Sequence, residues 1–145
     1  MLDLRNFIEL SNSATAAKEE TYIYRTQKAS GTERCTCRVS LGDSDCSEVI
    51  KFIGNQVRVL ASDDGEVIIA RGDRRLSILD SGRGYIAVSR LLPIIEKKFP
   101  NFKRVPMSCR WEQDGDGHKV FLLTPTGTYE RQERSAVGVR LEDKR

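Results

Sequence analysis

The sequence predicts an α+β fold that is mainly β, with short hairpins and two short helices. Three observations support this prediction. The chain has 145 residues, of which 39% are hydrophobic and 31% charged, which suits one folded domain. Short segments of alternating polarity are separated by Gly and Asp turn signals, as in hairpins. Two short apolar stretches repeat every three or four residues, as in helices.

The N-terminal region differs in composition from the rest of the chain. Residues 1–10 have apolar side chains at helical spacing. The following residues are polar and small, apart from a short candidate strand at Tyr22-Ile23-Tyr24. The expected organisation is an N-terminal helix and polar linker at 1–32, a single compact β-rich domain at 33–141, and a tail at 142–145.

The first part of the domain contains a strand, a helix and a hairpin. Residues 34–41 alternate in polarity and predict a strand. Asp45 and Glu48 have the spacing of a capping box, and Gly54 is a helix stop. The helix between them is expected to bury Val49, Ile50 and Ile53. Strands at 56–61 and 66–71 flank the turn Asp63-Asp64-Gly65, which predicts a hairpin.

The second part repeats this order. Strands at 75–80 and 84–88 flank Ser81-Gly82-Arg83, and strands at 105–111 and 119–123 flank the turn at 113–117. A helix between these hairpins places Leu91, Ile95 and Phe99 on one face and ends at Pro100. Residues 128–141 alternate weakly, as one or two edge strands do. The segments 34–71 and 75–124 therefore form a weak internal repeat.

Positive charge is concentrated in one segment of the chain. The formal net charge is only +3, but arginine outnumbers lysine by 16 to 8. Residues 71–110 carry a net charge of +7, whereas residues 33–70 carry −3. Such asymmetry is typical of proteins that bind nucleic acid. The candidate contact residues are Arg71, Arg74, Arg75, Arg83, Tyr85, Arg90, Lys97, Lys98, Lys103 and Arg104.

We therefore predict a nucleic-acid-binding protein, with DNA favoured over RNA, whose arginines neutralise phosphates. Aromatic residues are candidate surfaces for base stacking, Tyr85 above all because it lies beside Arg83. These aromatic candidates are Tyr22, Tyr24, Tyr85, Trp111, Phe121 and Tyr129. Two alternatives remain open. The basic segment is a solvated surface, or it docks an acidic partner, as in a small inhibitory protein of a phage or mobile element.

Neither a metal site nor a catalytic centre is predicted. Cys35, Cys37 and Cys46 lack the second cysteine pair of a structural zinc site, and we expect small buried residues or free thiols. His118 is the single histidine and lies beside a turn, which disfavours a catalytic role. Asp114-Gly115-Asp116-Gly117 resembles the start of a calcium loop, but Pro125 stands where the closing glutamate belongs. We expect no cofactor.

The expected location is the cytoplasm. The first ten residues lack the basic and apolar regions of a signal peptide. No run of about 18 apolar residues, the length that a membrane span needs, occurs in the sequence.

The segment Leu79–Leu92, LDSGRGYIAVSRLL, resembles the signature of AbrB/SpoVT-type swapped-hairpin proteins, including the two-repeat MraZ group. Asp80, Gly82, Arg83 and Ile86 match, while Ala87 replaces the usual proline. The resemblance covers about residues 79–123 and implies a dimeric or pseudo-dimeric DNA-binding barrel, with a DNA duplex and a second copy of the chain as the expected partners. It points to Arg83 and Arg90 as duplex contacts. The order of elements from Gln56 to Phe99 is also similar to Whirly-like single-stranded-DNA-binding domains.

Overall fold

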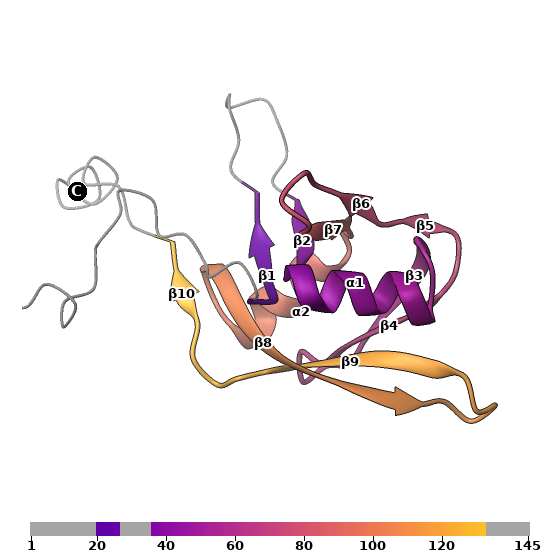
Figure 1. Ribbon diagram of the computed structural model, residues 1–145. Coiled ribbons are helices and arrows are strands. Elements are labelled where there is room, and N and C mark those ends of the chain that lie inside the picture. The colour runs from indigo at the N-terminus through magenta and orange to yellow at the C-terminus, as the bar shows by residue number, and fades with distance from the viewer. Residues whose placement is uncertain (1–19, 27–35, 133–145) are drawn as a thin grey trace, which may run out of the picture.

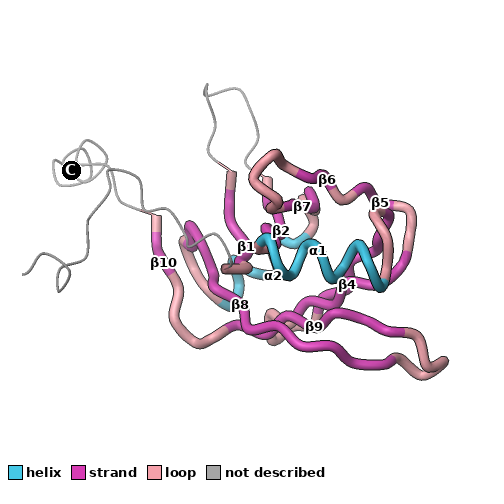
Figure 2. Tube along the Cα trace, viewed as in Figure 1, coloured by secondary structure: helices cyan, strands magenta, loops and turns pink. Residues whose placement is uncertain are grey.

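The computed structural model describes residues 20–26 and 36–132, which form a curved antiparallel sheet with two short helices (Figures 1 and 2). The predicted α+β, mainly β fold is confirmed. The strands are β1 Tyr22–Arg25, β2 Cys37–Leu41, β3 Gln56–Ala61, β4 Val67–Arg71, β5 Arg74–Arg75, β6 Ser77–Ile78, β7 Gly84–Ala87, β8 Phe102–Gln113, β9 Lys119–Pro125 and β10 Glu130–Arg131. The helices are α1 Asp43–Phe52 and α2 Leu91–Lys98.

The sheet curls until its two ends nearly meet. Its strand order is β5-β3-β4-β9-β8-β1-β2-β7-β6, and β10 pairs with β8 outside this path. The two terminal strands, β5 and β6, are separated in the chain by Leu76 alone. Because β5 pairs with β3 and β6 pairs with β7, this short segment joins the ends of the sheet. The result is a nearly closed, barrel-like sheet.

The two halves of the chain have the same topology. β1, β2, α1, β3 and β4 correspond in order to the β5–β6 segment, β7, α2, β8 and β9. Their pairings also correspond. The pairing of β1 with β2 corresponds to that of β6 with β7, and the pairing of β1 with β8 corresponds to that of β5 with β3. The contacts β2–β7 and β4–β9 join the halves. The repeat thus follows pseudo-two-fold symmetry, and its first unit also includes β1, before residue 34.

The core is built from the inward side chains of the strands and from one face of each helix. Ile23, Val39 and Ile69 are fully buried on three different strands. The predicted face of α2 is confirmed, since Leu91 and Ile95 are buried and Phe99 follows them into the core. A fully buried side chain of this size contributes about 1.5–3 kcal/mol. No helix in the described segments is long and apolar enough to cross a membrane.

The predicted capping box of α1 is wrong. The helix begins at Asp43, two residues before Asp45, and its N-cap residue is Gly42, which has no side chain to form a capping hydrogen bond. Asp45 instead accepts a hydrogen bond from Thr21 Oγ1 at 2.5 Å, and Glu48 accepts one from Trp111 Nε1 at 2.7 Å. Both carboxylates therefore accept hydrogen bonds from side chains outside the helix and do not cap its backbone N–H groups.

The buried face of α1 also differs from the prediction at one position. Cys46, Val49 and Ile53 are buried, but Ile50 is 36% exposed. Gly54 ends the helix as expected. Its φ of +115° lies in the region that side chains rarely adopt, which explains why glycine occupies this position.

The N-terminal strand belongs to the sheet. Tyr22–Arg25, expected within the linker at 1–32, forms β1 between β8 and β2. The folded domain therefore begins earlier than the sequence suggests. The expected helix at 1–10 and the tail at 142–145 lie outside the described residues. Of the expected edge strands at 128–141, the described part contains β10, which pairs with β8.

Candidate nucleic-acid interface

Arginine and tyrosine side chains share one outer surface over β8, β1, β2 and β7. We call this surface the Arg–Tyr face, and it comprises Tyr22, Tyr24, Arg38, Arg83, Tyr85 and Arg104. Strand alternation explains its position. Ile23, Cys37 and Val39 point into the core and are fully buried, so their neighbours along β1 and β2 point outward.

The first row of this face crosses three strands. Arg104 of β8 lies opposite Tyr24 of β1, which lies opposite Arg38 of β2. Arg38 Nη1 donates a hydrogen bond to the Tyr24 hydroxyl at 3.3 Å, and its guanidinium carbon lies 4.3 Å from the ring centre of Tyr85. The guanidinium carbon of Arg104 lies 5.0 Å from the ring centre of Tyr22. These cation–π contacts hold the arginines against aromatic rings.

The second row contains Tyr22 of β1, Ser40 of β2 and Tyr85 of β7, in adjacent register positions. Arg83 Nη2 donates a hydrogen bond to Ser40 Oγ at 2.6 Å, and the Arg83 guanidinium carbon lies 5.1 Å from the ring centre of Tyr22. Ser40 is buried, so Arg83 reaches down onto the sheet. Its stem and head are thereby fixed beside the tyrosines.

Glycines on both sides of Arg83 set the path of its backbone. Gly82 has a φ of +96°, which favours glycine in the turn between β6 and β7. A Cβ atom on Gly84 would lie 2.6 Å from Cys46 Sγ and 3.0 Å from the Ser77 carbonyl oxygen. Backbone conformation therefore favours glycine at position 82 and close packing favours it at position 84, and together the two glycines position Arg83 on the face.

A groove of about 400 Å³ runs beside the first row. Its lining residues are Tyr22, Tyr24, Arg25, Thr26, Arg38, Lys103 and Arg104. Two carboxylates offset part of this charge, since Glu96 pairs with Arg25, and Glu130 lies 3.2 Å from Arg104. Arg38 has no carboxylate partner among the described residues, and its Nε is buried without a hydrogen-bond acceptor. The groove consequently retains positive charge.

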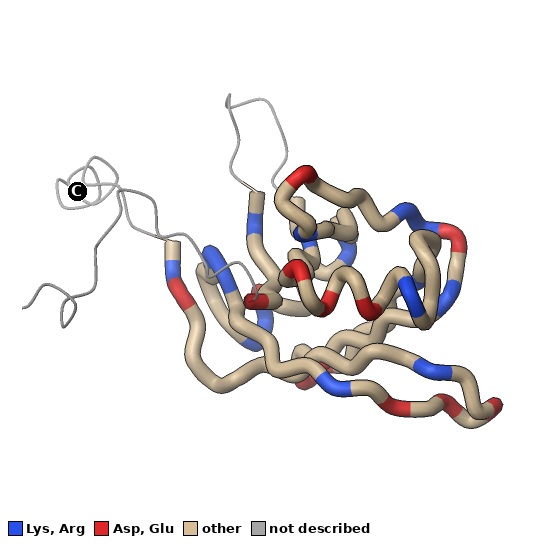
Figure 3. The backbone as a smooth tube through the Cα atoms, viewed as in Figure 1, with Lys and Arg blue, Asp and Glu red and all other residues tan. Residues whose placement is uncertain are grey.

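The predicted contact residues divide between this face and other surfaces. Arg83, Tyr85 and Arg104 belong to the Arg–Tyr face, and Lys103 lines the adjoining groove. The others are Arg71 at the end of β4, Arg74 and Arg75 on β5, Arg90 at the start of α2, and Lys97 and Lys98 in its last turn. Figure 3 shows the same spread of Lys and Arg over several elements. Arg74 Nη1 also donates to the Ala87 carbonyl at 2.8 Å, so this guanidinium braces β5 against β7.

Arg38 is absent from the predicted contact residues because it lies in the net-acidic part of the sequence. Tyr22 and Tyr24 are predicted only as general stacking candidates. The sequence indicates that both tyrosines point outward, since they flank Ile23, which is fully buried. The pairing of β1 with β2 and β8 brings them beside Arg38 and Arg104, and no local sequence pattern predicts this pairing.

Two of the cysteines lie in the core. Cys37 and Cys46 are buried and unpaired, and Cys35 lies outside the described residues. Burial raises the pKa of the Cys37 thiol to about 12, which disfavours the thiolate that a metal needs.

The turn between β8 and β9 brings Asp114, Asp116 and His118 within metal-ligating reach of one another. All three are solvent-facing residues of a turn. The Asp114 carboxylate already accepts the backbone N–H groups of Asp116 and His118, both at 2.9 Å. This arrangement is that of a self-stabilised turn.

Comparison with protein-family models, with curated proteins and with solved structures found no match for this chain. The resemblance to AbrB/SpoVT-type proteins therefore stays an expectation from the sequence. The functional argument rests on the geometry of the Arg–Tyr face.

Proposed function

We propose that this protein binds nucleic acid, as a small DNA-binding regulator, through the Arg–Tyr face. The observation that supports the proposal is the interleaving of three arginines with three tyrosines over four neighbouring strands. Guanidinium groups donate planar, paired hydrogen bonds to phosphate oxygens. Tyrosine rings offer flat surfaces to bases and sugars.

The existing contacts prepare the face for a ligand. Arg38, Arg83 and Arg104 each lie over a tyrosine ring, so their side chains are ordered before binding. Ordering a side chain in advance reduces the entropy lost on association. Neutralisation of phosphates then releases counterions, which gives affinity without reading a base sequence.

The test removes the three arginine charges while keeping part of each stem. We expect the combined variant Arg38→Gln, Arg83→Gln, Arg104→Gln to bind a fluorescent oligonucleotide at least about 100-fold more weakly than the parent, because three charged hydrogen-bond donors are lost. Fluorescence anisotropy at low salt measures this difference. Single-stranded and duplex DNA, and RNA of the same sequence, are compared in parallel.

A matched control removes the same charge elsewhere. Arg75, Arg90 and Lys97 are exposed and lie outside the Arg–Tyr face. Changing all three to Gln is expected to weaken binding by no more than about threefold. An equal loss in the control, or no binding by the parent at low salt, contradicts the proposal.

An acidic protein would be attracted to the same face, so capture experiments need nuclease-treated lysate. A stoichiometric protein retained after nuclease treatment, together with no affinity for oligonucleotides, supports that alternative instead. The expected homodimer is a separate proposal, which sedimentation of the full chain checks.

A further inference from the structure

A second pocket lies on a part of the molecule that the Arg–Tyr face does not use. Its volume is about 430 Å³, within the range of about 300–1,000 Å³ usual for small-ligand sites. It forms where the end of α1, the strands β3 and β4, and the start of β9 meet. Its lining residues are Phe52, Ile53, Arg58, Ala70, Arg71, Asp114, His118, Lys119 and Val120.

The charges lining this pocket are unbalanced. Arg58, Arg71 and Lys119 are cationic, and no carboxylate pairs with them among the described residues. Asp114 is the one lining carboxylate. Hydrogen bonds from the backbone N–H groups of His118 and Asp116 lower its pKa and keep it engaged with its own turn. Against these three cations, Asp114 leaves two positive charges unmatched in the lining.

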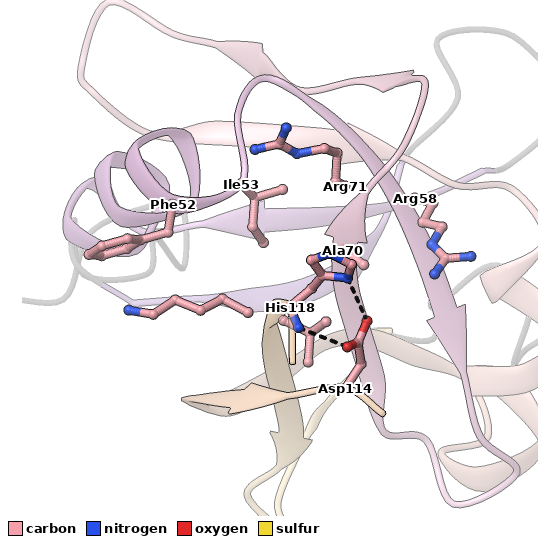
Figure 4. Close-up of a pocket in the computed structure, with 9 residues that line it drawn as sticks. Phe52, Ile53, Arg58, Ala70, Arg71, Asp114 and His118 are labelled. Carbon is pink, nitrogen blue, oxygen red and sulfur yellow. Dashed lines mark hydrogen bonds and ion pairs between the residues drawn. The ribbon is translucent and has the colours of Figure 1, made fainter. Parts of the chain in front are cut away.

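Phe52 and Ile53 line one side of the pocket, and Figure 4 shows Arg71 extending over Ile53 on this side. Arg58 lies on the opposite side, away from Phe52 and Ile53. Lys119 Nζ is 3.8 Å from the ring centre of Phe52. Phe52 and Ile53 thus offer an apolar wall, and Arg71 and Lys119 add positive charge to the lining of the same pocket.

We propose that this pocket binds a small phosphate monoester with an apolar or aromatic body, of the nucleotide class. A phosphate monoester carries a charge of about −1.5 to −2 at neutral pH, opposite in sign to the net charge of the lining. Arginine provides the planar fork that phosphate oxygens accept, and lysine adds a point charge. The apolar residues bind the body of the ligand. The site is independent of nucleic-acid binding at the Arg–Tyr face.

Adenosine 5′-monophosphate is the probe, and calorimetry with the full chain is the measurement. We expect saturable binding that adenosine alone does not show, and inorganic phosphate to bind at least tenfold more weakly than the nucleotide. Arg71→Ala is expected to weaken nucleotide binding at least tenfold. The Arg71 side chain is exposed and makes no hydrogen bond or ion pair with a described residue, so this variant should fold. Should it not fold, Lys119→Ala is measured in its place, with the same expected loss.

Two controls separate this site from the Arg–Tyr face. Arg90→Ala and Arg38→Gln are expected to leave the affinity for the nucleotide within about twofold, and Arg71→Ala to leave oligonucleotide binding unchanged. Failure of the nucleotide to bind at millimolar concentration overturns the proposal. The proposal is also overturned if Arg38→Gln, and not Arg71→Ala, weakens nucleotide binding. That result would assign the phosphate to the Arg–Tyr face and leave the proposed function intact. A 5′-phosphorylated dinucleotide that binds more tightly than the mononucleotide, in an Arg71-dependent way, identifies the monoester as a strand end.

Discussion

At the scale of single residues, the local sequence predicts a site residue where the backbone conformation itself requires particular residue types. Arg83 is predictable because the Gly-Arg-Gly turn that carries it has its own signal. Arg38 is not predictable, because its role depends on the tyrosines of two other strands. Charge averaged over a segment predicts only the sign of a partner's charge, and it does not show which guanidinium groups share a surface.

Gly84 gives a residue-scale prediction about the packing under Arg83. Gly84→Ala is expected to lower the free energy of unfolding by about 1–3 kcal/mol, since the added methyl group would collide with Cys46 and Ser77. Gly115→Ala is the matched control, because nothing lies within 4 Å of its Cβ position, and we expect a change within about 0.5 kcal/mol. Urea denaturation measures both. Similar values for the two variants contradict this packing.

At the scale of elements, α2 and the hairpins β3–β4 and β8–β9 follow from local signals, whereas α1 and β1 depend on tertiary contacts. The predicted strand at 75–80 divides at Leu76 into β5, which pairs with β3, and β6, which pairs with β7. The turn Asp63-Asp64-Gly65 and the spacing of Leu91, Ile95 and Phe99 predict their elements well. The start of α1 is mispredicted because its carboxylates bind distant groups. β1 is too short for its sequence to establish that it lies between two longer partners.

The placement of β1 in the sheet predicts a large effect for a residue in the expected linker. Ile23 is fully buried, so Ile23→Ala is expected to cost about 2–5 kcal/mol of stability. Leu60 is 42% exposed, and Leu60→Ala is expected to cost less than about 1 kcal/mol. Thermal or urea unfolding compares the two. A cost for Ile23→Ala as small as that of the control would show that β1 is not part of the folded domain.

The contact between α2 and β1 predicts a dependence of stability on pH. Desolvation opposes ionisation of Glu96, but hydrogen bonds from the Asn101 backbone N–H and from Arg25 outweigh it and lower the Glu96 pKa. This stabilisation is present above the ordinary pKa of 4.5 and is lost as the pH falls through the folded-state value. Because Glu96 is 40% exposed, Glu96→Gln should cost no more than about 1 kcal/mol at pH 7.

The cost of Glu96→Gln should then diminish in acid, as urea denaturation at pH 7 and pH 3 can measure. Glu112→Gln, which removes an exposed ion pair with Arg110, is the control and should change stability little at either pH. A cost for Glu96→Gln that is the same at both pH values contradicts the assigned ion pair.

At the scale of the whole molecule, the topology is pseudo-symmetric, but the distribution of arginine and tyrosine over the surface is not. β5 and β6 correspond to β1, yet they carry Arg75 and Ser77 and no tyrosine. The Arg–Tyr face therefore occurs on one side of the pseudo-two-fold barrel. The repeat is recognisable in the sequence from its order of elements, but this asymmetry is visible only when the strands are paired.

The proposed binding of nucleic acid to the Arg–Tyr face through phosphate contacts predicts that affinity depends on salt concentration. The slope of log affinity against log salt concentration is measured for the parent, the triple Arg38, Arg83, Arg104 variant and the triple control. For duplex DNA we predict that the face variant loses about 2–3 from the magnitude of the slope, near 0.9 per phosphate contact, while the control keeps the parental value. A slope that is unchanged in the face variant, or reduced equally in both variants, would contradict the claim.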